Sequence, residues 1–98
     1  MATFITTMHF TEQGIKAVRD TCKRAEAFNA TAKKLGVTVT ALYWTLGTFD
    51  GVIVCEAPDE ETATAALLQL GSLGNIRTQT ARAFDAGQMQ KILGLLPK

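Results

Sequence analysis

The order in which the hydrophobic spacing changes along the chain is the feature that most constrains its fold. In some segments apolar or β-branched residues alternate with other residues, and in others apolar residues recur every three or four positions. The first spacing is that of a β-strand, and the second is that of an amphipathic helix. From the N-terminus the order is strand, helix, two strands, helix, strand and a last helix.

Four segments have the residues and the alternation of strands: residues 3–10, 37–46, 52–57 and 76–84. The clearest is 37–46 (VTVTALYWTL), in which one face is predicted to carry Val37, Val39, Ala41, Tyr43 and Thr45, and the other Thr38, Thr40, Leu42, Trp44 and Leu46. The glycine-rich residues 47–51 supply turn chemistry, so the second and third strands are expected to form a hairpin.

Three segments have helical spacing. Residues 11–35 carry the stripe Ile15, Val18, Cys22, Ala25, Phe28, Ala32 and Leu35, with Gly36 as the stop. This helix is long for so small a chain, so a break capped by Asp20 or Thr21 is expected. Asp59 is a suitable N-cap for a helix that ends at Gly71, and Asp85 with Gln88 forms a capping box for the last helix.

This order predicts an α+β, ferredoxin-like βαββαβ fold: a four-stranded antiparallel sheet with both crossover helices on one face, extended by a C-terminal helix. The 98 residues fit one domain, residues 1–98. The uncovered face must then carry Tyr43 or Trp44 among other apolar groups, because both faces of each strand are partly apolar. A second copy of the chain is the simplest cover, so a homodimer or higher oligomer is expected.

Charge and cysteine content indicate which partners and compartment to expect. The net charge is +1, and the basic residues of segment 11–35 are interleaved with acidic ones, so no nucleic-acid partner is predicted. No run of about 18 apolar residues predicts a membrane span, and the N-terminal residues do not resemble a signal peptide. Cys22 and Cys55 lack metal-ligand or CxxC spacing and are expected to be free, buried thiols, which suits the cytoplasm.

Three blocks of sequence, TEQGIKAVRDTCKRAEAF, YWTLGTFDGVIVCEAPDEE and GSLGNIRTQTARAF, resemble the bacterial and archaeal GYD-domain family. The residues that name the family fall on Gly47, Phe49 and Asp50, with Phe in place of the family's Tyr. The resemblance runs from about residue 3 to 93 and implies a dimeric α+β barrel built on a ferredoxin-like fold. It does not by itself imply a reaction or a ligand.

A few residues are candidates for chemistry. His9 is the only histidine and Asp50 lies in the hairpin turn; both are weak candidates for a general base, and for Asp50 a structural role toward backbone N–H groups two residues on is favoured. Tyr43 and Trp44 point to opposite faces, and either could wall a ligand pocket.

Arg77 and Arg82 also lie on opposite faces, so at most one points inward, and that one needs an anion such as a ligand or Glu56. Any pocket is expected on the open sheet face, walled by Tyr43 or Trp44 and approached by His9, with Arg77 as a further binding residue. No metal site and no cofactor are predicted, because no ligand set is recognisable.

Three functions remain open from the sequence. The favoured one is a homo-oligomeric accessory or regulatory module that binds a partner protein or a small apolar or anionic molecule. The second is a small cofactor-independent enzyme that uses His9 or Asp50 in an aromatic pocket. The third is a purely structural oligomer with both sheet faces filled.

Overall fold

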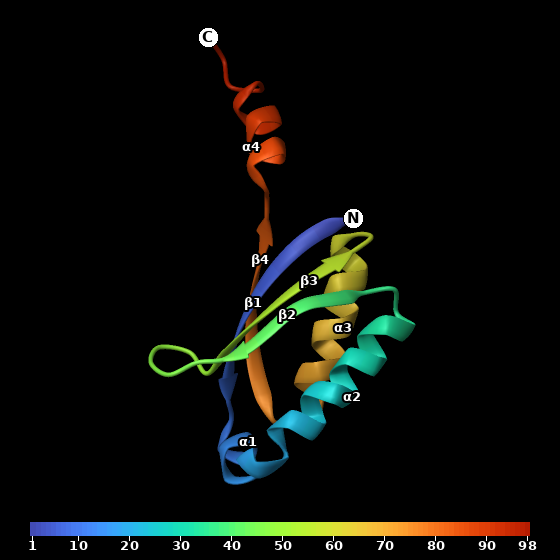
Figure 1. Ribbon diagram of the computed structural model, residues 1–98, viewed down its shortest axis with the longest axis vertical. Helices are drawn as coiled ribbons and strands as arrows, with labels where there is room; N and C mark the ends of the chain where they lie inside the picture. The colour runs from blue at the N-terminus through green and yellow to red at the C-terminus, as the bar shows by residue number, and fades with distance from the viewer.

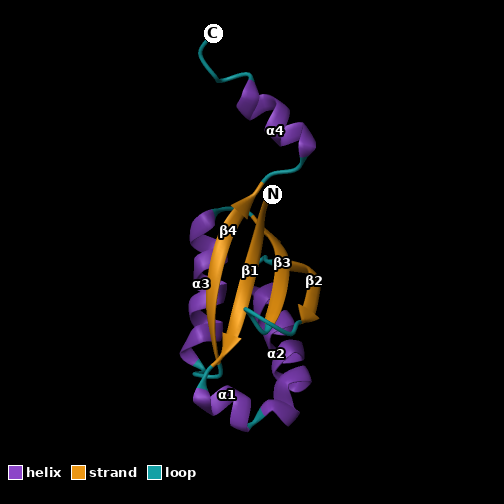
Figure 2. Cartoon of the chain, turned by 90° about the vertical axis from the view of Figure 1, so that its left-hand side faces the viewer, coloured by secondary structure: helices purple, strands orange, loops and turns teal.

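The computed structural model describes residues 1–98 as one antiparallel sheet with its crossover helices on a single face (Figures 1 and 2). The strands lie in the order β2-β3-β1-β4, as the ferredoxin-like fold requires. The elements are β1 (Ala2–Phe10), α1 (Glu12–Lys16), the 3-10 helix η1 (Val18–Asp20), α2 (Thr21–Lys34), β2 (Thr38–Trp44), β3 (Gly51–Ala57), α3 (Glu60–Ser72), β4 (Ile76–Ala83) and α4 (Ala86–Leu93).

The first helical segment is broken, as expected from its length, and the break falls at residues 17–20. The Thr11 side chain caps α1 by accepting from the Gly14 N–H at 3.0 Å. Of the two predicted caps, Asp20 occupies the N-cap position of α2 and Thr21 is the first helical residue, but the Asp20 side chain makes no capping hydrogen bond. The break also interrupts the apolar stripe, and only Phe28 and Ala32 of α2 are buried. Cys22 is therefore exposed, and the prediction that it is buried is wrong.

The register of the strands decides which side chains face the helices. Phe4, Thr6 and Met8 of β1 are buried under the helices, and residues directly across from them on β3 and β4 share that face. Ile53 and Cys55 of β3 complete the centre of this layer. Thr6 is fully buried, and its hydroxyl lies 2.8 Å from the hydroxyl of Thr80 on β4, so its polar group is satisfied.

Strand β2 departs from simple alternation at a bulge between Val39 and Ala41. Val39 pairs with Cys55 on the helix side, whereas Ala41 pairs with Val54 on the open side. Thr38 likewise pairs with Glu56 on the open side. The predicted faces are therefore wrong at Thr38 and Val39, because the extra residue of a bulge shifts the alternation by one.

Helix α3 begins as predicted. The Asp59 carboxylate accepts a hydrogen bond from the Thr62 N–H at 2.7 Å. Hydrogen bonding to the side chain of Thr62, and then to its backbone N–H, lowers the pKa of Asp59 below its ordinary value. Ala63, Ala66 and Leu70 are buried against the sheet, and the helix continues one residue beyond Gly71.

Helix α4 stands apart from the rest of the molecule. It follows β4 directly and extends away from the end of the sheet (Figures 1 and 2). The predicted capping box is present, with the Asp85 carboxylate accepting from the Gln88 N–H and the Gln88 side chain accepting from the Asp85 N–H, each at 2.8 Å. No residue of α4 is buried. The helix is therefore formed by local capping and does not contribute to the core.

Candidate functional site

The hairpin turn at residues 45–50, which carries the family-like motif, is held by a dense set of hydrogen bonds. The Thr45 N–H donates to the Asp50 carbonyl at 2.9 Å, and the Thr45 hydroxyl donates to the Phe49 carbonyl at 2.6 Å. Gly47 adopts a φ of 112°, a conformation that other residues rarely reach. The turn projects on the side of the sheet opposite to α2 and α3 (Figure 1). It is a protrusion whose shape is fixed by its own backbone.

Asp50 and His9 tie this turn to β1. The Asp50 carboxylate accepts from the Phe10 N–H at 2.8 Å, and the Asp50 N–H donates to the Met8 carbonyl at 2.8 Å. The His9 Nε2 lies 3.0 Å from the Thr48 carbonyl oxygen. Since a carbonyl only accepts, Nε2 carries a proton and donates this hydrogen bond.

The two weak candidates for a general base are thus both engaged in positioning the turn. The sequence favours an Asp50 carboxylate that accepts from backbone N–H groups of its own turn. The carboxylate accepts instead from the N–H of Phe10 on β1, 40 residues earlier in the chain.

Three of the four predicted ligand-binding residues lie on the open face, near the end of the sheet next to the turn. Tyr43 is paired with Val52, and His9 is paired with Arg77, so the three occupy β2, β1 and β4 of the same face. Tyr43 is 64% exposed. Figure 2 shows this face uncovered by any helix. The open face is thus identified, and it combines apolar groups with a histidine and an arginine.

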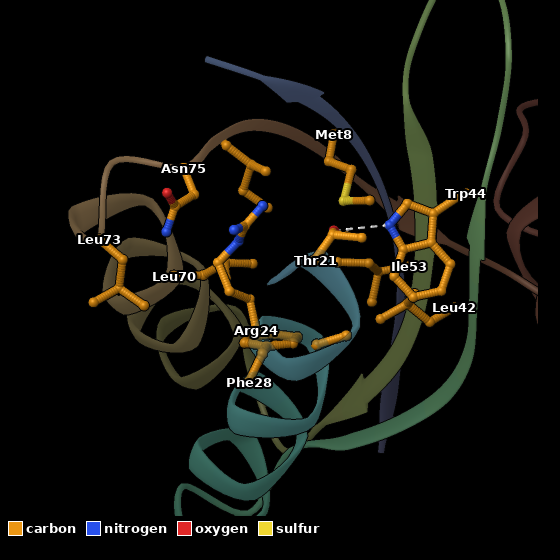
Figure 3. A pocket seen from close by; sticks show the side chains of 12 residues that line it. Met8, Thr21, Arg24, Phe28, Leu42, Trp44, Ile53, Leu70, Leu73 and Asn75 are labelled. Atoms are coloured by element: carbon orange, nitrogen blue, oxygen red, sulfur yellow. Dashed lines mark hydrogen bonds between the residues drawn. The ribbon is translucent and has the colours of Figure 1, made fainter. Parts of the chain in front are cut away.

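Trp44 lies on the other side, at the mouth of a cavity between the sheet and the helices (Figure 3). Its indole N–H donates to the Thr21 hydroxyl at 3.0 Å. The cavity has a volume of about 40 Å³ and is lined mainly by apolar side chains, with Arg24 and Asn75 among the polar ones. The Arg24 guanidinium donates to the Ala17 carbonyl at 2.8 Å, which ties α2 to the preceding break.

The position of this cavity departs from the sequence-based expectation of a pocket on the open face. The helices do not seal the sheet at the point where α2 begins, so a hollow remains beneath them. A few water molecules would fill 40 Å³, whereas drug-sized ligands occupy pockets of about 300–1,000 Å³.

A larger hollow of about 430 Å³ runs between α3 and the edge strand β4. Arg82 lies beside it, on the helix side, 3.8 Å from the Glu60 carboxylate and 4.6 Å from the centre of the Phe84 ring. The inward arginine therefore pairs with Glu60 and not with Glu56, which lies on the open face opposite Thr3. Glu60 is the first residue of α3, so the pairing depends on how α3 crosses the sheet, which the sequence pattern does not reveal.

Three further features limit the chemistry and the setting of the chain. Burial raises the pKa of the Cys55 thiol, so this cysteine is a poor nucleophile. Nowhere do three or more histidine, cysteine, aspartate or glutamate side chains gather as they would around a metal ion. No helix is long and apolar enough to cross a membrane.

Comparison with known proteins adds a family and a named relative. The family model described as GYD domain matches residues 4–93. A protein of Thermus thermophilus named "Glutamine synthetase and cystathionine beta-lyase binding protein" is 33% identical over 90 residues, which cover 91% of this chain and 95% of that protein.

Two solved structures are similar to the chain to different degrees. A crystal structure of a Thermus thermophilus protein superposes with a TM-score of 0.57 at 24% identity, covering 88% of this chain and 96% of the other. An ACT domain protein from Streptococcus pneumoniae gives a TM-score of 0.49 at 18% identity, covering 85% and 90% of the two chains. The first of these is similar in fold over nearly its whole length.

Proposed function

Because this chain belongs to the GYD domain family, with a model match over residues 4–93, we propose that it is an accessory or regulatory protein that acts by binding an enzyme. The observation that carries the proposal is the Thermus relative, whose printed name describes binding to glutamine synthetase and cystathionine beta-lyase. The match spans 91% of this chain and 95% of the relative, which supports a shared mode of binding. We propose these two enzymes as the first partners to test, in the cytoplasm.

The geometry supports binding over catalysis. The His9 Nε2 and the Asp50 carboxylate both serve backbone groups of the hairpin turn. Tyr43 and Arg77, by contrast, are exposed on the open face and are free to meet another molecule. Fifteen large hydrophobic side chains of the chain are exposed, which favours a surface made for association.

The test is direct binding of the purified full-length chain to purified glutamine synthetase and cystathionine beta-lyase from the same organism. Calorimetry is expected to give a saturable heat with micromolar or tighter affinity for at least one enzyme, and that enzyme's activity is expected to change when the chain is in excess. Serum albumin serves as the non-specific control. Absence of binding to both enzymes would contradict the proposal.

A second candidate is binding of a small apolar or anionic molecule, favoured by the cavity beside Trp44. Only a compact group of few atoms fits the 40 Å³ inside the helices. Trp44 is the only tryptophan, so its fluorescence reports on this site alone. A saturable change on addition of small anionic or aromatic metabolites is expected if the cavity binds them, and an unchanged spectrum across the set excludes it.

A further inference from the structure

The hollow between α3 and the edge strand β4 is large enough to hold a small metabolite. Its volume is about 430 Å³, within the range of about 300–1,000 Å³ that is usual for ligand pockets. Figure 2 shows α3 and β4 side by side. The hollow is lined by an apolar group (Phe4, Ala63, Leu67 and Leu68), a hydroxyl group (Thr64, Thr78 and Thr80) and one charged pair (Glu60 and Arg82).

The guanidinium of Arg82 is held in place and still has unused donors. Its Nη1 donates to the backbone carbonyls of Thr3 and Ala83. The guanidinium lies over two aromatic rings, 4.6 Å from the centre of Phe84 and 5.7 Å from the centre of Phe4. Nε and Nη2 make no hydrogen bond in the protein. These two nitrogens form the edge of a guanidinium that binds a carboxylate through two parallel bonds, so Arg82 offers a positioned anion-binding edge.

Glu60 lies close to this edge but does not occupy it. Its Oε1 is 3.8 Å from the Arg82 Nε, whereas an N–H···O hydrogen bond spans about 2.7–3.2 Å. The Glu60 side chain is 68% exposed, and ion pairs exposed to this degree stabilise a fold very little. A ligand carboxylate can therefore take the edge of Arg82 at small cost, and Glu60 remains beside it as an acceptor for a cation.

We propose that the hollow is a binding site for a free α-amino acid with an apolar side chain. The carboxylate of the ligand accepts from Nε and Nη2 of Arg82, and its ammonium group donates to the Glu60 carboxylate. Both charged groups of an α-amino acid are attached to one carbon atom, so they can meet two opposite protein charges that are themselves adjacent. A simple anion would use Arg82 and leave Glu60 as a repelling neighbour.

The walls of the hollow determine the kind of side chain that fits. Leu67 and Leu68 of α3 and the buried Phe4 of β1 provide apolar contacts, and no third charged residue lines the hollow. A charged ligand side chain would lose hydration there without gaining a partner. Leucine and methionine are therefore favoured over glutamate and lysine. The hydroxyls of Thr64 and Thr78 add the few polar groups that orient a ligand in an apolar pocket.

Calorimetry of the purified full-length chain with leucine and methionine tests the site. A saturable heat is expected for at least one of them, with a dissociation constant of about 1 mM or tighter. Isocaproate lacks the ammonium group of leucine, and isopentylamine lacks its carboxylate. Each is expected to bind about tenfold more weakly than leucine, or weaker still. Trp44 is the only tryptophan and does not line the hollow, so its fluorescence is expected to stay unchanged when leucine binds.

Three variants assign the binding to the charged pair. Arg82→Gln removes the anion-binding edge and is expected to weaken leucine binding about tenfold or more. Glu60→Gln is expected to weaken leucine binding about tenfold without weakening isocaproate, because Glu60 meets only the ammonium group. This exposed substitution carries the test if Arg82→Gln fails to fold. Arg77→Gln is the matched control, since it removes an arginine of the same strand that pairs with His9 on the open face, and it should leave leucine binding unchanged.

Several results would overturn the inference. These are no saturable binding of leucine or methionine, equal affinity for leucine and isocaproate, or full leucine affinity in Glu60→Gln. A change in Trp44 fluorescence with leucine binding retained in Arg82→Gln would assign the ligand to the cavity beside Trp44 and would also overturn it. No enzyme is present in these experiments, so the proposed function is judged separately.

Discussion

Replacing Asp50 by alanine is expected to destabilise the fold, because the carboxylate holds the hairpin turn to β1. The bond from the Phe10 N–H, 2.8 Å long, has an ionised acceptor, and such bonds contribute about 1.5–3 kcal/mol. The site is half-buried, so water can partly replace the lost oxygen. We therefore expect the free energy of unfolding to fall by about 1–2 kcal/mol, with Tm lowered by about 4–15 °C for a chain of this size.

Urea denaturation followed by Trp44 fluorescence provides the measurement, at one fixed protomer concentration so that any self-association affects all variants equally. Asp50→Asn retains an acceptor oxygen and is expected to lose less than half as much. Asp20→Ala, which removes an exposed carboxylate without a capping bond, is the matched control and should change stability by less than about 0.5 kcal/mol.

An unchanged midpoint in Asp50→Ala would refute the structural role. If the same variant also lost binding to its partner enzyme, Asp50 would have to be assigned to the binding surface instead.

Three further outcomes are expected. Gly14→Ala should destabilise the protein by about 1–3 kcal/mol or more in thermal unfolding, because the added methyl group runs into the backbone carbonyl of Asn75. Acid should destabilise the protein through Asp59, whose pKa is lowered in the folded state. The contribution of Asp59 to the free energy of unfolding is present above its ordinary pKa of 3.8 and is lost as the pH falls through the folded pKa. Asp59→Asn should flatten this dependence of stability on pH. In a thiol titration Cys22 should react at once, whereas Cys55 should react only on unfolding, because it is buried and its pKa is raised.

Each of these has its own control. Gly87→Ala places a methyl group on α4 in ordinary van der Waals contact, 3.5 Å from the Asp85 carboxylate, and should not destabilise. Asn is also a good N-cap, so Asp59→Asn should be well folded at neutral pH, and an acid profile identical to the wild type would count against the capping bond. Rapid reaction of both thiols in the native protein would show that Cys55 is accessible.

Local sequence determined the secondary structure to within a few residues. The alternating segments became the four strands, and the capping signals at Asp59 and Asp85 make the hydrogen bonds expected of them. The predictions of strands and helix caps succeed because strand alternation and helix capping involve residues close together in the chain. The GYD family was likewise recognisable from three blocks of sequence, and the match over residues 4–93 confirms it.

The faces of the strands and the partners of the charged groups were decided only by the tertiary structure. The bulge that reverses Val39 depends on pairing with β3. Arg82 pairs with Glu60, and the Asp50 carboxylate accepts from the Phe10 N–H. The partners in each pair are far apart in the sequence, so no local sequence pattern predicts them. Cys22 is exposed because the break before α2 interrupts the helical stripe.

The spacing of hydrophobic residues therefore determined the order of strands and helices in this protein. Each element buries one side, and the spacing of its buried residues differs between a strand and a helix. The tertiary structure decided that Trp44 lines a cavity under the helices while Tyr43 is left on the open face, because that choice depends on which side α2 and α3 cross. It also left α4 outside the core, although its apolar spacing is that of a helix packed on its own sheet. An amphipathic pattern specifies that a surface must be covered, and only the spatial arrangement shows whether the same chain covers it.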